Sequence, residues 1–278
     1  RVMERRRKRL GLESTRPWDR GVDQFGRPAL RPAETVAELN EKSLNVFEKV
    51  DPLFRKYYQS MIDHDLLDLD SRKNKAGGAY SLGYNVANMP MIFMSHTNSL
   101  IDVGTIIHEG GHAFHTFECA HLRFHQKAEQ YVPAEFAEVA SMGMELLASP
   151  YINKESGGYF TEEESARATI DNLEGIISFW PYMALVDAFQ HWIYENHAEA
   201  SDGQRCEEKW GELWDRFMIG IDYSGFEKYK NIYWHRQGHI HTTPFYYVEY
   251  GLAQLGAVQV FGNALKNLSA GPLGNIII

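Results

Sequence analysis

A five-residue motif near the middle of the chain, His108-Glu109-Gly110-Gly111-His112, limits the folds that this sequence can adopt. Two histidines four residues apart lie on the same face of an α-helix, so both imidazoles can reach one Zn²⁺ ion. Glu109 follows the first histidine, where its carboxylate can take a proton from a water at an open coordination position. The motif therefore predicts a helix that carries a metal site and a general base.

The residues around the motif predict how this helix begins and packs. Ser99 and Asp102 have the spacing of a capping box at a helix start. Apolar neighbours on both sides predict that the helix is buried. Gly110 and Gly111 each cost roughly 1 kcal/mol relative to alanine inside a helix, so the pair predicts close approach of another element.

A catalytic zinc site needs a third protein ligand. His115 lies close to the same helix face, but three ligands from consecutive turns of one straight helix would lie nearly in a line. The later segment PAEFAEVASMGMELLAS offers a second helix with three glutamates, Glu135, Glu138 and Glu145. Glu138 is the preferred candidate because its small neighbours allow close approach, and Glu135 is the second. The predicted ligands of one Zn²⁺ ion are therefore His108, His112 and Glu138.

The hydrophobic periodicity predicts a mainly α fold with a small β element. Strands are expected at about 79–84 and 91–96. Helices are expected at about 33–63, 100–115, 134–147, 162–197 with a kink at Pro181, 204–219 and 245–266. We expect residues 1–32 to form an extended N-terminal segment and residues 33–278 to form one helical core.

Composition excludes several classes of partner. The net charge of −9 disfavours nucleic acid, so the basic run at 1–9 is interpreted as a solvated surface. No apolar run is long enough for a membrane helix, and the N-terminus does not have the pattern of a secretory signal. The two cysteines, Cys119 and Cys206, cannot form a disulfide framework, which indicates a reducing compartment and a cytoplasmic location.

A second group of reactive side chains lies near the C-terminus, in WHRQGHIHTTPFYYVEYGLAQLGA. A phenol can donate a hydrogen bond to the oxyanion formed during attack on a carbonyl, and an imidazole can bind a peptide backbone. Tyr247 and Tyr250 share a face if a helix begins near Phe245. Aromatic residues more often fill a core, but the stretch HRQGHIH is too polar for one. The candidates here are His235, His239, His241, Tyr246, Tyr247 and Tyr250.

Three motifs in this order, HEGGHAFH, EVASMGMELL and HRQGHIHTTPFYYVEYGLAQLGA, resemble the oligoendopeptidase F group within the thimet oligopeptidase class of zinc metallopeptidases. The segments LGLESTRPWD, LDLDSRKNKAGGAY and PMIFMSHTN are similar to the same group, so the resemblance covers nearly the whole chain. It implies a zincin-like helical catalytic domain with a small sheet, whose edge strand near 79–84 pairs with the peptide. It also implies zinc binding by His108, His112 and Glu138, general-base catalysis by Glu109, and contacts to substrate and transition state by His239, Tyr247 and Tyr250.

Members of this group are about twice as long, and their N-terminal half forms one wall of a channel that admits short oligopeptides. The resemblance implies that this chain is the catalytic half, with the other half missing or supplied by a second chain. The leading hypothesis is a zinc-dependent endopeptidase that acts on oligopeptides. The alternatives are a non-catalytic fragment that binds zinc and peptide, and a zinc carboxypeptidase in which Arg236 would bind the terminal carboxylate. The presence of Glu109 and of the tyrosines and histidines favours the endopeptidase.

Overall fold

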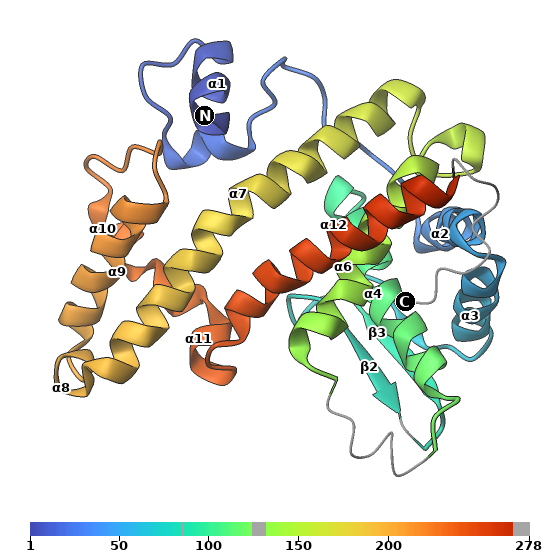
Figure 1. The fold of residues 1–278 in the computed structure, drawn as a ribbon. Coiled ribbons are helices and arrows are strands. Elements are labelled where there is room, and N and C mark those ends of the chain that lie inside the picture. The colour runs from blue at the N-terminus through green and yellow to red at the C-terminus, as the bar shows by residue number, and fades with distance from the viewer. Residues whose placement is uncertain (85, 124–131, 269–278) are drawn as a thin grey trace. The chain divides into compact units, whose positions relative to one another are not determined.

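The structure is a computed structural model that describes residues 1–84, 86–123 and 132–268. The chain divides into two compact units. Unit 1 comprises residues 1–28 and 172–251, and unit 2 comprises residues 29–171 and the chain from 252 onward. The predicted mainly helical fold with a small sheet is confirmed (Figure 1).

The elements of unit 2 include the sheet and the predicted metal-binding helices. They are α2 (Val36–Val50), α3 (Pro52–Asp63), β1 (Leu67–Asp68), β2 (Tyr80–Tyr84), β3 (Met89–Phe93), α4 (Leu100–Cys119), α6 (Ala134–Ala148) and two 3-10 turns, Ser149–Tyr151 and Lys154–Ser156. Two long helices, α7 (Glu162–Glu195) and α12 (Glu249–Leu268), contribute residues to both units.

The elements of unit 1 are mostly short helices. They are α1 (Val2–Arg9), α8 (His197–Ala200), α9 (Gly203–Phe217), α10 (Glu227–Asn231), α11 (Gly238–Thr242) and three 3-10 helices, Pro17–Gly21, Ile232–Arg236 and Tyr246–Val248. Residues 1–32, expected to be extended, thus contain α1 and the 3-10 helix Pro17–Gly21.

The sheet has the strand order β1-β3-β2, with β1 parallel and β2 antiparallel to β3. The register pairs Tyr80 with Phe93 and Tyr84 with Met89. The predicted strand at 79–84 is confirmed as β2, and it lies at an edge of the sheet. The second predicted strand, 91–96, is shifted, because β3 begins at Met89 and ends at Phe93.

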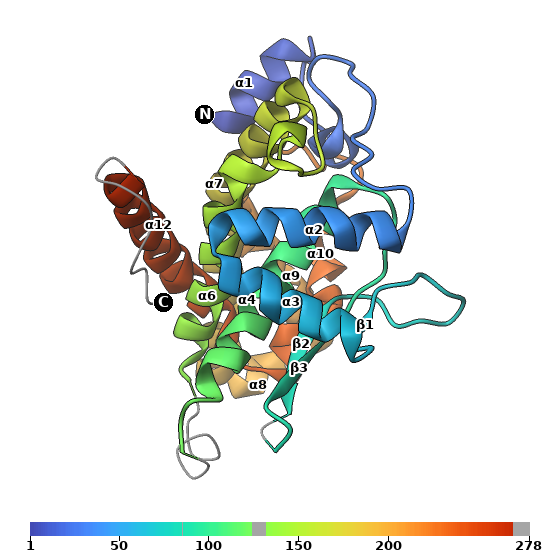
Figure 2. The ribbon, with the colours of Figure 1, turned by 90° about the vertical axis from the view of Figure 1, so that its right-hand side faces the viewer.

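The helical pattern predicted at 33–63 is confirmed, but the structure divides it into two helices. Thr35 caps the start of α2 by accepting a hydrogen bond from the Glu38 N–H. Asp51 then caps α3, and Pro52 occupies its first turn. Proline cannot donate a backbone hydrogen bond and disfavours helical geometry in the preceding residue, so the chain breaks here. The two helices pack against each other (Figure 2).

The helix expected at 245–266 begins later than predicted. Phe245 has a left-handed backbone conformation, with φ of 63°, which is incompatible with a continuous right-handed helix. A 3-10 helix at Tyr246–Val248 follows, and α12 begins at Glu249. By contrast, α7 runs through Pro181 as one helix.

Each unit has its own hydrophobic core. In unit 2, the ring of Phe47 from α2 packs edge-on against Phe114 from α4, with centroids 4.8 Å apart. In unit 1, the core is built around the buried indoles of Trp210 and Trp214 from α9. Among the described residues, no helix is both long enough and apolar enough to cross a membrane.

Candidate metal centre

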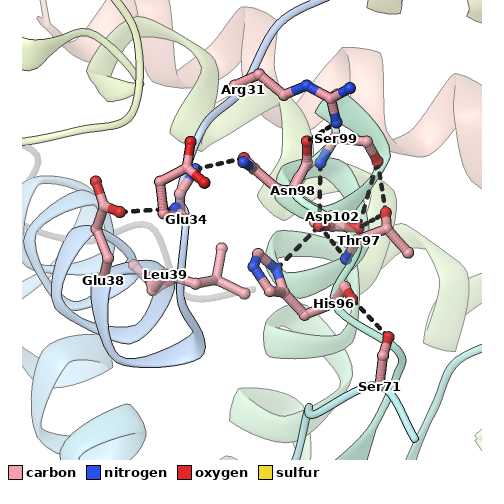
Figure 3. Close-up of polar contacts among 12 residues, drawn as sticks. Arg31, Glu34, Glu38, Leu39, Ser71, His96, Thr97, Asn98, Ser99 and Asp102 are labelled. Atoms are coloured by element: carbon pink, nitrogen blue, oxygen red, sulfur yellow. Dashed lines mark hydrogen bonds and ion pairs between the residues drawn. The ribbon is translucent and has the colours of Figure 1, made fainter.

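The start of α4 is fixed by the buried carboxylate of Asp102. Asp102 and Ser99 form the predicted capping box. The same carboxylate accepts hydrogen bonds from the Thr97 N–H and hydroxyl, at 2.7 and 2.8 Å, and lies 3.0 Å from Nδ1 of His96 (Figure 3). These contacts hold the first turn of α4 against the segment that follows β3, and so they set the direction of the helix that carries the motif.

The two glycines of the motif allow α4 to approach its neighbours closely. A Cβ atom added at Gly110 would lie 2.7 Å from the Phe47 ring. One added at Gly111 would lie 2.6 Å from both the Ala140 carbonyl oxygen and the Ser141 Cα atom in α6. The predicted close packing is confirmed, and it brings the backbone of α6 against α4 (Figure 1).

We expect Gly111→Ala to lower the free energy of unfolding by about 1–3 kcal/mol, because the new methyl group must displace the backbone of α6. Gly104→Ala is the matched control on the same helix, since a Cβ there meets nothing within 4 Å. The control should be stabilised by up to about 1 kcal/mol through its higher helix propensity. Urea unfolding measures both, and equal stability of the two variants would refute the close contact.

The structure brings together the three residues predicted to bind the metal. Nε2 of His108 and Nε2 of His112 lie 3.3 and 3.5 Å from the same carboxylate oxygen of Glu138. One ligand atom from each residue lies within 4.8 Å of the other two. Glu138 is only 4% exposed, and the Ser141 hydroxyl donates a hydrogen bond of 2.8 Å to its Oε2 atom.

The spacing of these donors fits a zinc ion. Ligand atoms about 2.0–2.2 Å from a tetrahedral ion lie about 3.3–3.6 Å from one another. The two measured distances from imidazole to carboxylate are 3.3 and 3.5 Å. Two imidazoles and one carboxylate are also the ligands of hydrolytic zinc sites, which leave a fourth position open.

The three residues form an electrostatically coupled group in which Glu138 is buried and the two histidines are half-buried. Burial alone would raise the pKa of Glu138, but the hydrogen bonds from His108 and His112 outweigh it and hold this pKa well below its usual range. Burial opposes protonation of His108, yet its contacts with Glu138 and Glu145 raise the pKa of this imidazole. The Glu138 carboxylate is therefore ionised, which is the form in which a carboxylate can bind a metal ion.

Glu109 lies beside this group on α4 and is 6% exposed. Burial raises the pKa of its carboxyl group, and the nearby imidazoles of His108 and His112 partly offset that effect. The backbone N–H of Ser81 in β2 interacts with the carboxylate, whereas Oε2 has no hydrogen-bond partner among the residues that the structure describes. Glu109 thus offers a buried acceptor with a raised proton affinity, as a general base requires.

Glu145 does not join the three ligands but lies behind one of them. Its carboxylate accepts a hydrogen bond of 2.7 Å from Nδ1 of His108. This contact directs the Nε2 atom of His108 toward Glu138. Carboxylates that bind the second nitrogen of a metal-ligating histidine fix the orientation and the tautomer of its ring.

We expect Glu145→Ala to weaken zinc affinity by about 10–100-fold, because His108 would lose the group that orients it. Competition with a chromophoric chelator measures this change. Glu135→Ala is the matched control on the same helix, and it should retain the affinity of the unmodified chain. A similar loss in both variants would show that Glu145 has no specific role.

The other ligand candidates lie outside the cluster. Glu135 occupies the first turn of α6, and neither it nor His115 belongs to the group of potential ligands found among the described residues. Burial lowers the pKa of His115, which keeps this imidazole neutral. The geometric objection to three ligands from one straight helix thus agrees with the structure.

The predicted substrate-binding residues cluster with one another in unit 1. The His239 ring lies 5.1 Å from the Tyr247 ring and 5.9 Å from the Tyr250 ring, between centroids. Tyr247 is buried in the core of this unit and packs against Phe179. Tyr250 is half-buried, and so is Tyr246, whose ring stacks on His239. His235 and His241 are exposed and lie near the Trp234 ring.

Sequence reasoning missed residues that support the functional side chains. Ser141 is one of the small neighbours of Glu138 that predict close packing, but the sequence does not show that its hydroxyl donates a hydrogen bond to the Glu138 carboxylate. Gln237, which bonds to His239, lies within the polar stretch HRQGHIH, but its role required knowledge of the turn between the 3-10 helix and α11. The sequence signal that could have indicated this contact is the position of a polar residue, Gln237, two residues before the candidate histidine His239.

Comparisons with known proteins agree on one family. The sequence model described as peptidase family M3 matches residues 1–272. Oligopeptidase PepF of Bacillus subtilis (strain 168) is 28% identical over 183 residues, which is 64% of this chain and 26% of that protein. An oligoendopeptidase F homolog of Mycoplasma genitalium is 25% identical over 144 residues, covering 51% of this chain and 23% of that protein.

A solved structure shares the fold. The structure of PZ peptidase A with an inhibitor matches with a TM-score of 0.82 and 30% sequence identity. The match covers 96% of this chain and 46% of the other chain. The described fold therefore corresponds to less than half of the longer protein.

Proposed function

Because this chain belongs to peptidase family M3, we propose that it is a zinc-dependent endopeptidase that hydrolyses peptide bonds in short oligopeptides. The observation that supports this most strongly is the placement of His108, His112 and Glu138 at the separations of zinc ligands. Zinc bound by these residues supplies a Lewis acid that polarises the scissile carbonyl and lowers the pKa of the attacking water.

The protein residues then move the protons. Glu109 accepts a proton from the water as its oxygen attacks the carbonyl carbon. The carbonyl oxygen becomes an oxyanion, which a phenol O–H such as that of Tyr250 stabilises by donating a hydrogen bond. Glu109 returns the proton to the amide nitrogen when the C–N bond breaks, so that the leaving amine departs neutral. His239 and Tyr247 are assigned to substrate contact by the resemblance of their motif.

The edge strand β2 is the proposed site for the backbone of the substrate. Within the described part of the chain, β3 is its only strand partner, and its side chains at Tyr80, Leu82 and Tyr84 are exposed. An extended peptide can add a strand to such an edge through main-chain hydrogen bonds, with little dependence on its sequence. The Ser81 N–H that interacts with Glu109 belongs to this strand, so β2 and the general base are neighbours.

We expect a zinc-loaded preparation to cleave an internally quenched oligopeptide that is acetylated at its N-terminus and amidated at its C-terminus. A strong chelator should abolish cleavage, and added zinc should restore it. Cleavage that persists after complete removal of metal would contradict the proposal.

The blocked termini also separate the two alternatives from the proposal. A carboxypeptidase needs a free terminal carboxylate and would cut only the unblocked peptide, at its last bond. A non-catalytic fragment would bind zinc and peptide without cleavage.

A further inference from the structure

Four polar groups of unit 1 form a continuous chain of contacts that ends at Tyr250. The Tyr182 hydroxyl, on α7, lies 3.0 Å from Oε1 of Gln237. Nε2 of Gln237 lies 2.7 Å from Nδ1 of His239, in α11. Nε2 of His239 in turn lies 3.4 Å from the Tyr250 hydroxyl, in α12. A hydroxyl, an amide and an imidazole thus connect a buried part of α7 to a proposed catalytic phenol.

The chemistry of the groups sets the direction of these hydrogen bonds. The Tyr182 hydroxyl donates to the carbonyl oxygen of the Gln237 side chain. The amide group of Gln237 is then left to donate toward His239, because its nitrogen carries only donors. Nδ1 of His239 must accept that hydrogen bond, and a neutral imidazole with an accepting Nδ1 carries its proton on Nε2.

The packing around Tyr182 keeps the first donor in place. Its ring makes edge contacts with Trp210 and Trp214, with centroids 6.3 and 6.2 Å away, and with Tyr247 at 5.8 Å. Burial, reinforced by the neighbouring phenols, raises the pKa of Tyr182 above its usual range, so the hydroxyl keeps its proton. His239 is likewise enclosed by the rings of Tyr246, Tyr247 and Tyr250, which limits rotation of the imidazole.

We propose that Tyr182 and Gln237 are positioning residues that hold His239 in its Nε2–H tautomer and thereby direct the Tyr250 O–H toward the substrate. With Nε2–H pointing at the phenol oxygen, Tyr250 accepts from His239, and its own proton serves an acceptor other than His239. In the opposite tautomer, Nε2 would accept the Tyr250 proton and turn it away from a developing oxyanion. The assignment of the substrate as that acceptor rests on the proposed function.

The test uses ¹⁵N-histidine labelling of the full chain and long-range ¹H–¹⁵N correlation, which distinguishes a protonated from an unprotonated ring nitrogen. A His239→Asn spectrum assigns the signals of interest. We expect the unmodified chain to show a protonated Nε2 and an unprotonated Nδ1 at His239. Gln237→Glu keeps the size of the side chain but replaces the donor by an acceptor, so Nδ1 should become protonated. Because a neighbouring carboxylate also favours the doubly protonated ring, the spectra are compared at alkaline pH, where the imidazole carries one proton and Nε2 should have lost it.

Tyr182→Phe removes the group that orients the amide without altering Gln237. Because one hydrogen bond of ordinary strength changes an equilibrium by roughly twofold to tenfold, we expect a mixture of tautomers in this variant. Circular dichroism and urea unfolding identify any variant that fails to fold. Tyr182→Phe and Gln237→Glu chains that fold normally but retain the Nε2–H tautomer would overturn the proposal, and so would a protonated Nδ1 in the unmodified chain.

Turnover of the blocked peptide provides the second readout. Gln237→Glu should lower kcat by up to about 10²–10³, the effect of losing one oxyanion donor, with little change in KM. A tautomer that inverts while kcat stays unchanged would overturn the role of Tyr250 in the proposal. Since the spectrum needs neither zinc nor substrate, an inactive unmodified chain with the expected tautomer would count against the proposed function and leave the hydrogen-bond chain established.

Discussion

Replacement of Glu109 by glutamine should reduce kcat for peptide hydrolysis by about 10²–10⁴ while the zinc content stays at one ion per chain. The amide has nearly the same size as the carboxylate, so the packing of α4 against its neighbours is retained. It cannot accept the proton of the attacking water, because its nitrogen has no lone pair for that purpose and its oxygen is a very weak base. The loss should therefore appear in the chemical step.

Steady-state kinetics with the blocked peptide and metal analysis of the same sample measure this result. Glu118→Gln is the matched control, since Glu118 is an exposed carboxylate on the same helix that accepts a hydrogen bond from Tyr57. The control should keep the kcat of the unmodified chain. Turnover in Glu109→Gln that equals that of the control would show that another group activates the water.

Replacement of Glu138 by glutamine should weaken zinc binding by more than about 100-fold. This loss exceeds the roughly 10–100-fold loss that is typical when a residue that hydrogen-bonds to a metal ligand is replaced. Glu138 supplies the only negative charge among the three ligands. It is also the one ligand that comes from α6, so without it the two imidazoles of α4 must hold the ion alone. A neutral amide oxygen in the same position is a poor ligand for zinc compared with a carboxylate.

The zinc-dependent rise in Tm is a second readout for this variant. An ion that binds only the folded chain stabilises it by about 2.7 kcal/mol at a concentration of 100 Kd. The unmodified chain and Glu135→Gln should both show this rise, and Glu138→Gln should not at the same zinc concentration. An equal rise in all three would place the metal elsewhere.

Much of the candidate metal centre could be predicted from the sequence, because the positions of its side chains follow from the local geometry of an α-helix. The spacing of His108 and His112 places both side chains on one helix face whatever the rest of the chain does. The two glycines predicted a close neighbour, and the small residues around Glu138 predicted which helix would supply it. The structure agrees with these expectations at Gly110, Gly111 and Ser141.

Two features of the backbone could not be predicted from the hydrophobic pattern: the break between α2 and α3, and the late start of α12. The break at Asp51–Pro52 is a local signal that the strong apolar periodicity of residues 33–63 concealed. The left-handed Phe245 has no such signal, since a bulky aromatic residue rarely adopts that conformation.

Hydrogen bonds between residues that are far apart in the sequence could not be predicted either, and two of them support the candidate functional residues. Glu145 follows Glu138 by seven residues, and the sequence does not reveal whether it binds a metal or a histidine. The link from Tyr182 to Gln237 joins residues 55 positions apart and exists only in the folded unit. Such long-range hydrogen bonds need coordinates.

The proposed activity depends on His108, His112 and Glu138 binding one zinc ion. Anomalous diffraction from a crystal of the zinc-loaded chain, collected on both sides of the zinc absorption edge, tests this directly. We expect a single peak per chain, about 2.0–2.2 Å from Nε2 of His108, Nε2 of His112 and a carboxylate oxygen of Glu138. A peak bound by other residues, or no peak in a crystal grown with excess zinc, would contradict the account.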